Sequence, residues 1–107
     1  MNVEDHEFDE DLNAKEALVE DILLIICKQE FPANNGDLRV LSNIQNSFLQ
    51  KLTLNWKNFA PTYVRQLLAR LEQLATEDVL LDFHKLFLLA IDNEDTAVRI
   101  LAIRGLG

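Results

Sequence analysis

Apolar residues recur every three or four positions from Leu12 to the end of the chain, which is the period of an α-helix and not of a strand. Five helices are expected from this pattern, separated by short segments rich in Pro, Gly, Asn or Asp. They span about 13–31, 38–54, 61–75 and 76–91, and the fifth begins after Asp95. The fold class predicted from the pattern is therefore all-α.

Residues suited to helix N-termini mark where these helices begin. Asn13, Asp37, Thr76 and Asp95 have side chains that can accept a hydrogen bond from the first backbone N–H groups of a helix. Pro61 suits a first helical position, which needs no N–H donor. The clearest apolar stripe follows Pro61, with Val64, Leu67, Leu68, Leu71, Leu74 and Ala75. The expected core set of the next helix is Val79, Leu80, Phe83, Leu86, Phe87, Ala90 and Ile91.

Short links between the expected helices indicate that successive helices lie antiparallel. About five antiparallel helices can form a closed bundle or an open stack of helix pairs. The stack is favoured because the last segment stays apolar through Ile103 and Leu106, whereas repeat arrays end in a polar unit. We therefore expect residues 12–107 to be one helical domain that continues into further repeats, or whose last helix pairs with another molecule.

The net charge of -8 at pH 7 is concentrated at the N-terminus. Residues 1–21 contain nine acidic residues and one Lys, whereas residues 22–107 contain nine acidic and nine basic residues. Six of the acids fall within residues 1–11, where few apolar side chains are present to offset the entropy of ordering. We expect residues 1–11 to be an acidic, disordered tail on a neutral body.

Cysteine content, hydropathy and the first residues of the chain indicate the cellular compartment of the protein. Cys27 is the single cysteine, so no disulfide forms within the chain. The longest apolar run, residues 22–27, is far shorter than the roughly 20 residues that span a bilayer. The first residues are acidic where a secretory signal carries basic residues. These features predict a cytoplasmic protein.

Few residues are suited to chemistry. His84 has no partner at the three- or four-residue spacing of a helical metal site. Cys27 lies in an apolar run with no basic neighbour on that face to lower its pKa, which favours a small buried hydrophobe over a nucleophile. We therefore expect no catalytic residue, no metal site and no cofactor, and a protein that is not an enzyme.

The C-terminal part of the chain has a helix, an Asp-rich turn and a second helix carrying a Val-Arg pair. The turn reads Asp-x-x-Asp-x-x-Val-Arg, formed by Asp92, Asp95, Val98 and Arg99. This segment resembles a HEAT repeat. A fainter likeness reaches upstream to Trp56, so residues 56–107 together resemble the N-terminal cap and first repeat of bacterial HEAT-repeat proteins of unassigned activity. Residues 1–55 match no such pattern.

The resemblance implies structural roles for this turn. In HEAT arrays, Asp and Arg residues such as Asp92 and Arg99 form a ladder between repeats. Asp92 and Asp95 can also accept hydrogen bonds at the start of the following helix, while Val98 allows close helix packing. Arg99 can reach acids in its own turn or in an adjoining repeat.

The expected function is a non-catalytic scaffold for protein–protein contacts, because helical arrays bind through faces built from successive helices. The candidate face joins the amide-rich second helix to two arginines of the third: Gln45, Asn46, Gln50, Arg65 and Arg70. One alternative is an accessory domain of a HEAT-containing enzyme or lyase whose active residues lie elsewhere. The partner is expected to be a protein, with no membrane involved.

A second alternative is weak nucleic-acid binding. Basic and aromatic residues alternate over one stretch of the chain: Lys51, Trp56, Lys57, Phe59, Tyr63, Arg65 and Arg70. Such a combination can hold phosphates and stack on bases. The absence of a dense basic cluster and the acidic N-terminus oppose this interpretation, and a Trp in a short link is more often a plug over helix ends. Nucleic acid is therefore the less favoured partner.

Overall fold

A computed structural model describes the backbone of residues 3–107 and the side chains of residues 14–107. Residues 3–107 contain helices and no strand, which confirms the all-α fold class. The elements are α1 (Val3–Cys27), the 3₁₀-helix η1 (Asn35–Leu41), α2 (Asn46–Trp56), α3 (Pro61–Glu77), α4 (His84–Ala90) and α5 (Thr96–Leu106). None of the helices in this part of the chain has the length and apolar character that a membrane crossing requires.

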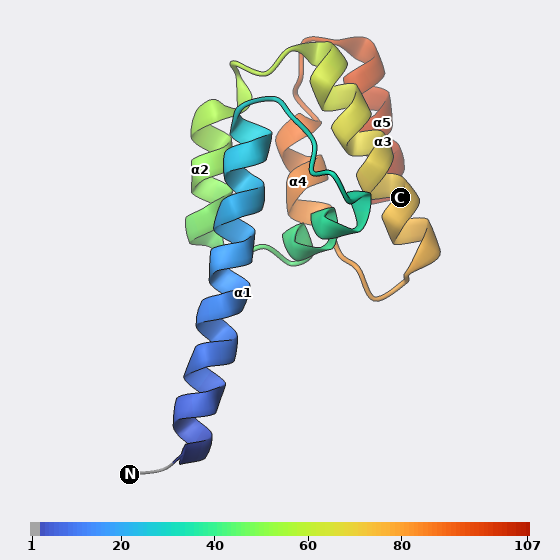
Figure 1. The fold of residues 1–107 in the computed structure, drawn as a ribbon. Helices are drawn as coiled ribbons and strands as arrows, with labels where there is room; N and C mark the ends of the chain where they lie inside the picture. The colour runs from blue at the N-terminus through green and yellow to red at the C-terminus, as the bar shows by residue number, and fades with distance from the viewer. Residues whose placement is uncertain (1–2) are drawn as a thin grey trace.

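The helices form two sets that run in opposite directions (Figure 1). α1, α2 and α4 run one way, and α3 and α5 run the other way. α2 packs on α1 and α4, whereas α5 packs on α3 and α4. The parallel orientation of α1 and α2 differs from the expected antiparallel order. It arises because residues 28–45 carry the chain back along the body before α2 begins.

α1 ends at Cys27 and not near residue 31, because Gln29 adopts a left-handed conformation with φ 58°. The N–H of Gln29 donates to the carbonyl of Ile26 at 2.8 Å, and that of Glu30 to Ile25 at 3.1 Å. This is the Schellman pattern that closes a helix, in which Gly is the usual residue. The Gln29 side chain holds the turn in place, since its Oε1 accepts from the N–H of Ala60 at 2.7 Å.

The start of α1 differs from the sequence expectation. The helix begins at Val3, so its bounds include most of the segment expected to be a tail. The side chain of Asn13, the expected N-cap, lies outside the described residues. The expectation that residues 1–11 form a disordered tail separate from the body stays a prediction, since their side chains and contacts lie outside the described residues.

The helix expected over residues 38–54 is divided into η1 and α2. Asn34 caps η1, with its Oδ1 accepting from the N–H of Gly36 at 2.9 Å, so the expected cap, Asp37, lies inside the element. The division occurs at Ser42 and Asn43, where Asn43 has φ 49°. A distant segment supplies hydrogen bonds there: the N–H of Asn43 donates to the carbonyl of Asp82 at 2.7 Å, and Ser42 Oγ accepts from the N–H of Asp82 at 2.8 Å.

The helix expected to start at Thr76 starts at His84 instead, because α3 continues to Glu77. The Thr76 hydroxyl donates back to the carbonyl of Glu72 at 2.9 Å and caps nothing. Residues 78–83 form a loop, in which Val79 and Leu80, expected in the core, are 90% and 87% exposed. Apolar residues therefore keep the helical spacing through residues 78–83, although this segment is not helical.

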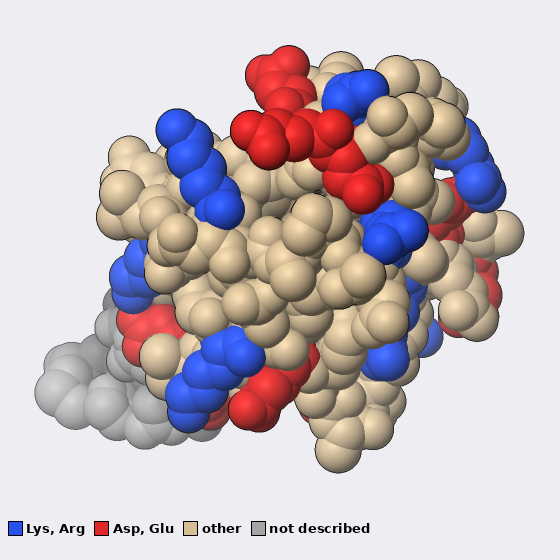
Figure 2. Space-filling model, turned by 90° about the horizontal axis from the view of Figure 1, so that it is seen from above, with Lys and Arg blue, Asp and Glu red and all other residues tan. Residues whose placement is uncertain are grey.

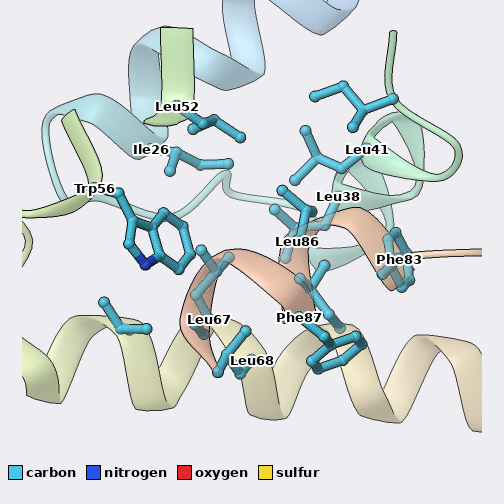
Figure 3. Packing of buried hydrophobic residues seen from close by; sticks show 14 of the residues in the cluster. Ile26, Leu38, Leu41, Leu52, Trp56, Leu67, Leu68, Phe83, Leu86 and Phe87 are labelled. Atoms are coloured by element: carbon cyan, nitrogen blue, oxygen red, sulfur yellow. The ribbon is translucent and has the colours of Figure 1, made fainter. Parts of the chain in front are cut away.

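The core is a single apolar cluster to which every helix of the body contributes. Figure 3 shows Leu38 of η1, Leu86 of α4, Ile26 of α1 and Leu52 of α2, which all belong to this cluster. The stripe expected after Pro61 is confirmed, since α3 buries Tyr63, Val64, Leu67, Leu68, Leu71 and Leu74. The main neighbours of α3 are α5 and η1.

α5 approaches α4 closely at Gly105. A Cβ added there would lie less than 3 Å from three carbon atoms of the Phe87 ring, which is buried. α5 also buries two small side chains, Val98 and Ala102. Small residues on this side of α5 therefore determine how near the two helices come.

Candidate interaction surface

The Asp-rich turn between α4 and α5 is formed largely as its sequence suggests. Asp95 caps α5, with its Oδ1 accepting from the N–H of Val98 at 3.0 Å, and Val98 is buried. Arg99 closes the same turn: its Nη1 donates to the carbonyls of Asn93 at 2.9 Å and Glu94 at 3.0 Å. Its Nη2 donates to Thr96 Oγ1 at 3.1 Å. Asp92 is exposed, and within the described residues no hydrogen bond or ion pair joins it to Arg99.

The two acids of this turn should differ in their effect on stability. Asp95→Ala is expected to lower the free energy of unfolding by about 1 kcal/mol, because it removes an N-cap. Asp92→Ala is the matched control, expected to change stability by less than about 0.5 kcal/mol because the side chain is exposed. Urea denaturation followed by circular dichroism measures both. Equal losses for the two variants would contradict the capping role of Asp95.

The residues of the candidate face lie on separate parts of the body. Gln45, Asn46 and Gln50 are exposed at the start of α2, and Gln45 makes no side-chain capping bond. Arg70 is partly buried on α3, where its guanidinium stacks 3.8 Å from the Phe31 ring and its Nη1 donates to Asn35 Oδ1 at 3.2 Å. The main neighbours of α2 are α1 and α4, whereas those of α3 are α5 and η1. The amides therefore lie at the start of α2 and Arg70 on α3, and these two helices are not main neighbours of each other.

Arg65, the other arginine of the candidate face, is also partly buried on α3. Its Nε is buried and has no hydrogen-bond partner among the described residues. The Nε1 atom of Trp56 is in the same state. Arg65 and Arg70 therefore contribute packing to α3, and neither is a freely exposed cation.

The aromatic side chains expected beside the basic residues are buried. The ring centroids of Trp56 and Phe59 are 5.6 Å apart, as are those of Phe59 and Tyr63, and Phe31 stacks on Tyr63 at 4.8 Å. Trp56 closes the end of α2, in agreement with the packing interpretation. In this conformation these rings offer no platform for bases.

The lysines on this side do not form a basic cluster. Lys51 lies 3.7 Å from the carboxylate of Glu20, an exposed pair that contributes little to stability. Lys57 is exposed just beyond α2. Figure 2 views the body from above relative to Figure 1. On that face Lys and Arg side chains are scattered among Asp and Glu, with no continuous basic area.

Tyr63 connects the end of α1 to α3. Its hydroxyl donates to the carbonyl of Glu30 at 2.6 Å. Burial is the main cause that raises the pKa of its phenol; Cys27 and Glu30 raise the pKa further, and the Arg70 guanidinium partly offsets them. The phenol therefore stays neutral in the folded protein at pH values where a free tyrosine ionises.

Tyr63 should make folding sensitive to alkaline pH. Above its ordinary pKa of 10.0 the unfolded chain loses a proton that the folded chain retains. Its contribution to the free energy of unfolding is therefore complete below that pH and falls above it, by up to about 1.4 kcal/mol per pH unit. Urea denaturation between about pH 9 and 11 should show a steeper decline for the wild type than for Tyr63→Phe. Identical slopes would contradict this assignment.

The two residues considered for chemistry lie apart from each other. Burial raises the pKa of the half-buried Cys27 thiol, which disfavours the reactive thiolate. His84 is exposed at the first position of α4, and its backbone N–H donates to Asp82 Oδ1 at 2.9 Å. Among residues with described side chains, no group of three or more His, Cys, Asp or Glu could hold a metal ion.

A cleft that sequence reasoning missed lies between α1 and the junction of η1 with α2. Its volume is about 300 Å³, and its walls are mixed, with apolar Val19, Val40, Ile44 and Phe48 beside polar Lys15, Glu16, Ser42, Asn43 and Gln45. Ser42 and Asn43, at the break between η1 and α2, are among its lining residues. A cleft of this size and composition can accept one or two aliphatic side chains.

Comparison with protein-family models, curated proteins and solved structures finds no match to this chain. Function is therefore inferred from the geometry of the molecule itself.

Proposed function

We propose that this chain is a HEAT-like helical-repeat segment that serves as a non-catalytic scaffold for protein–protein contacts. The observation that carries the proposal is the order of helix directions. α2 and α4 lie side by side in one direction, and α3 and α5 lie side by side in the other. Two successive helix pairs, α2 with α3 and α4 with α5, would have this order of directions when stacked, and of these two pairs α4 and α5 pack closely on each other.

The turn between α4 and α5 supports the same proposal. In a repeat of this kind the second helix must start at a fixed angle to the first, and here Asp95 and Arg99 restrain the turn from both sides. α3 and α5, the corresponding helices of the two pairs, are also joined directly, since Arg104 of α5 pairs with Glu72 of α3 at 2.9 Å. Repeated contacts of this type would transmit one repeat's orientation to the next.

The outer face of α5 is where the array would continue. Ile100 and Ile103 are exposed on this helix, on the side away from the buried Val98 and Ala102. A further repeat, or a second molecule, would cover these two side chains. The scaffold would then present faces made by several helices in succession.

Affinity capture followed by mass spectrometry tests the scaffold function. The immobilised full chain and a chain beginning at Leu12 are exposed to a lysate of the organism that carries the gene. The proposal expects the same proteins to be enriched on both, because the body and not the acidic N-terminus supplies the binding faces. Enrichment of nucleic acid or a small molecule without any protein would show the proposal to be wrong.

A further inference from the structure

We propose that Val79 and Leu80, the tip of the loop between α3 and α4, form a docking knob for a protein partner with an apolar pocket rimmed by Lys or Arg. This inference rests on the proposed scaffold function and assigns it a binding site. The loop is visible in Figure 1 at the end of the body from which α1 projects. Three observations carry the assignment: exposure, pre-organisation and local charge.

The tip exposes two consecutive large aliphatic side chains almost completely. The residues that follow behave differently, since Leu81 is half-buried and Phe83 is buried in the core. Phe83 therefore anchors the loop in the core, while Val79 and Leu80 are exposed to solvent. Two adjacent aliphatic side chains on a protruding loop are suited to fill a concave apolar pocket.

The tip is held at both ends by hydrogen bonds. On the α3 side, Asp78 Oδ1 accepts from the N–H of Leu80 at 3.0 Å, and the Asp78 carbonyl accepts from the N–H of Leu81 at 3.2 Å. On the α4 side, the backbone of Asp82 is bonded to Ser42 and Asn43. A loop restrained in this way loses little conformational entropy on binding, which favours affinity.

The charge around the tip indicates the chemistry of the partner. Residues 71–84 contain four acids and no Lys or Arg. Of these acids, Glu72 is paired with Arg104, which leaves Glu77, Asp78 and Asp82 beside the tip. The nearest following base, Lys85, points away, since its Nζ donates to the carbonyl of Ile44 at 2.8 Å. A basic rim on the partner would complement these carboxylates and speed association.

The same charge argues against other occupants. An anionic membrane or a nucleic acid would be repelled by three carboxylates at the point of contact. A second copy of this chain would offer the cleft beside α1, but its rim carries Glu16 as well as Lys15 and is therefore not basic. A separate protein with a basic-rimmed pocket is therefore the occupant that the observations favour.

The test compares Val79→Ser/Leu80→Ser with a matched control, Leu54→Ser, which removes an aliphatic side chain that is 81% exposed on α2. A protein captured by the wild type is identified, purified and titrated against each variant by calorimetry. The inference expects affinity at least tenfold weaker for the double variant and unchanged for Leu54→Ser. Glu77→Lys should weaken binding several-fold, and raising salt from about 50 to 300 mM should reduce the difference. All three variants should melt like the wild type, because the altered side chains are exposed.

The other outcomes separate this inference from the proposed function. A captured protein that binds the double variant as tightly as the wild type overturns the docking knob and leaves the scaffold function standing. Absence of any captured protein overturns both. Sedimentation equilibrium showing a dimer that the double variant lacks, or binding to anionic lipid vesicles that it lacks, assigns the tip to another occupant and overturns the inference.

Discussion

Replacing Leu38 by alanine is expected to lower the free energy of unfolding by about 2–5 kcal/mol, the range for large-to-small changes at fully buried sites. Leu38 is fully buried although it lies in a single 3₁₀-helix of seven residues. η1 packs on both α1 and α3, so the cavity would open between helices that run in opposite directions. Equilibrium denaturation in urea measures the loss.

Leu54→Ala is the matched control, since it removes the same atoms from an exposed position on α2. Its effect should stay within about 0.5 kcal/mol. Similar losses for the two variants would mean that η1 does not anchor the body, and the packing described for Leu38 would be wrong.

Gly105→Ala is expected to lower the free energy of unfolding by about 1–3 kcal/mol, the range for overpacking a core. The expected loss of stability is informative, because a Gly→Ala change at an open position within a helix raises the free energy of unfolding by up to about 1 kcal/mol. The new methyl group would enter the space occupied by the Phe87 ring, so α5 would have to move away from α4. Thermal or urea denaturation gives the size of the effect.

Two further variants test this explanation. Gly107→Ala should be nearly neutral, since its Cβ would meet only carbonyl oxygens at ordinary contact distance, 3.7 Å. Phe87→Leu added to Gly105→Ala should lose less stability than the sum of the two single changes, because the smaller side chain relieves the overlap. Strict additivity would contradict a clash between these two residues.

Local signals in the sequence were sufficient for part of the fold. The stripe of α3 and its start at Pro61 follow from residues within the helix itself. The same holds for the capping of α5 by Asp95, whose partner, Val98, is three residues away. Elements whose ends are determined by neighbours in the chain are therefore predictable from pattern alone.

The errors fall where the partners are distant in the sequence. The break at Ser42 and Asn43 depends on Asp82, and the turn that ends α1 is held by the Gln29 side chain, which accepts a hydrogen bond from the N–H of Ala60. The spacing of apolar residues every three or four positions continues through both places. It therefore predicts one helix over 38–54 and a first helix that is too long at its C-terminal end. Neither position contains the glycine that usually marks such a turn.

The candidate site was predictable only in part for the same reason. Asp95 and Arg99 act within one turn, and the sequence indicated both. The candidate face from Gln45 to Arg70 requires a particular arrangement of α2 against α3, which the spacing of apolar residues does not specify. Val79 and Leu80 have the spacing of core residues, which predicts burial, although the loop turns them outward.

The hydrogen bonds that join Asp82 to Ser42 and Asn43, between η1 and α2, also bear on how fast the molecule folds. Each segment leaves its helix at a point where the other satisfies its backbone groups, so neither is stable there until both are in place. Closing this contact brings together residues 40 positions apart, an entropic barrier that a bundle of sequential hairpins avoids. The rate of folding should therefore reflect this non-local closure more than the formation of any single helix.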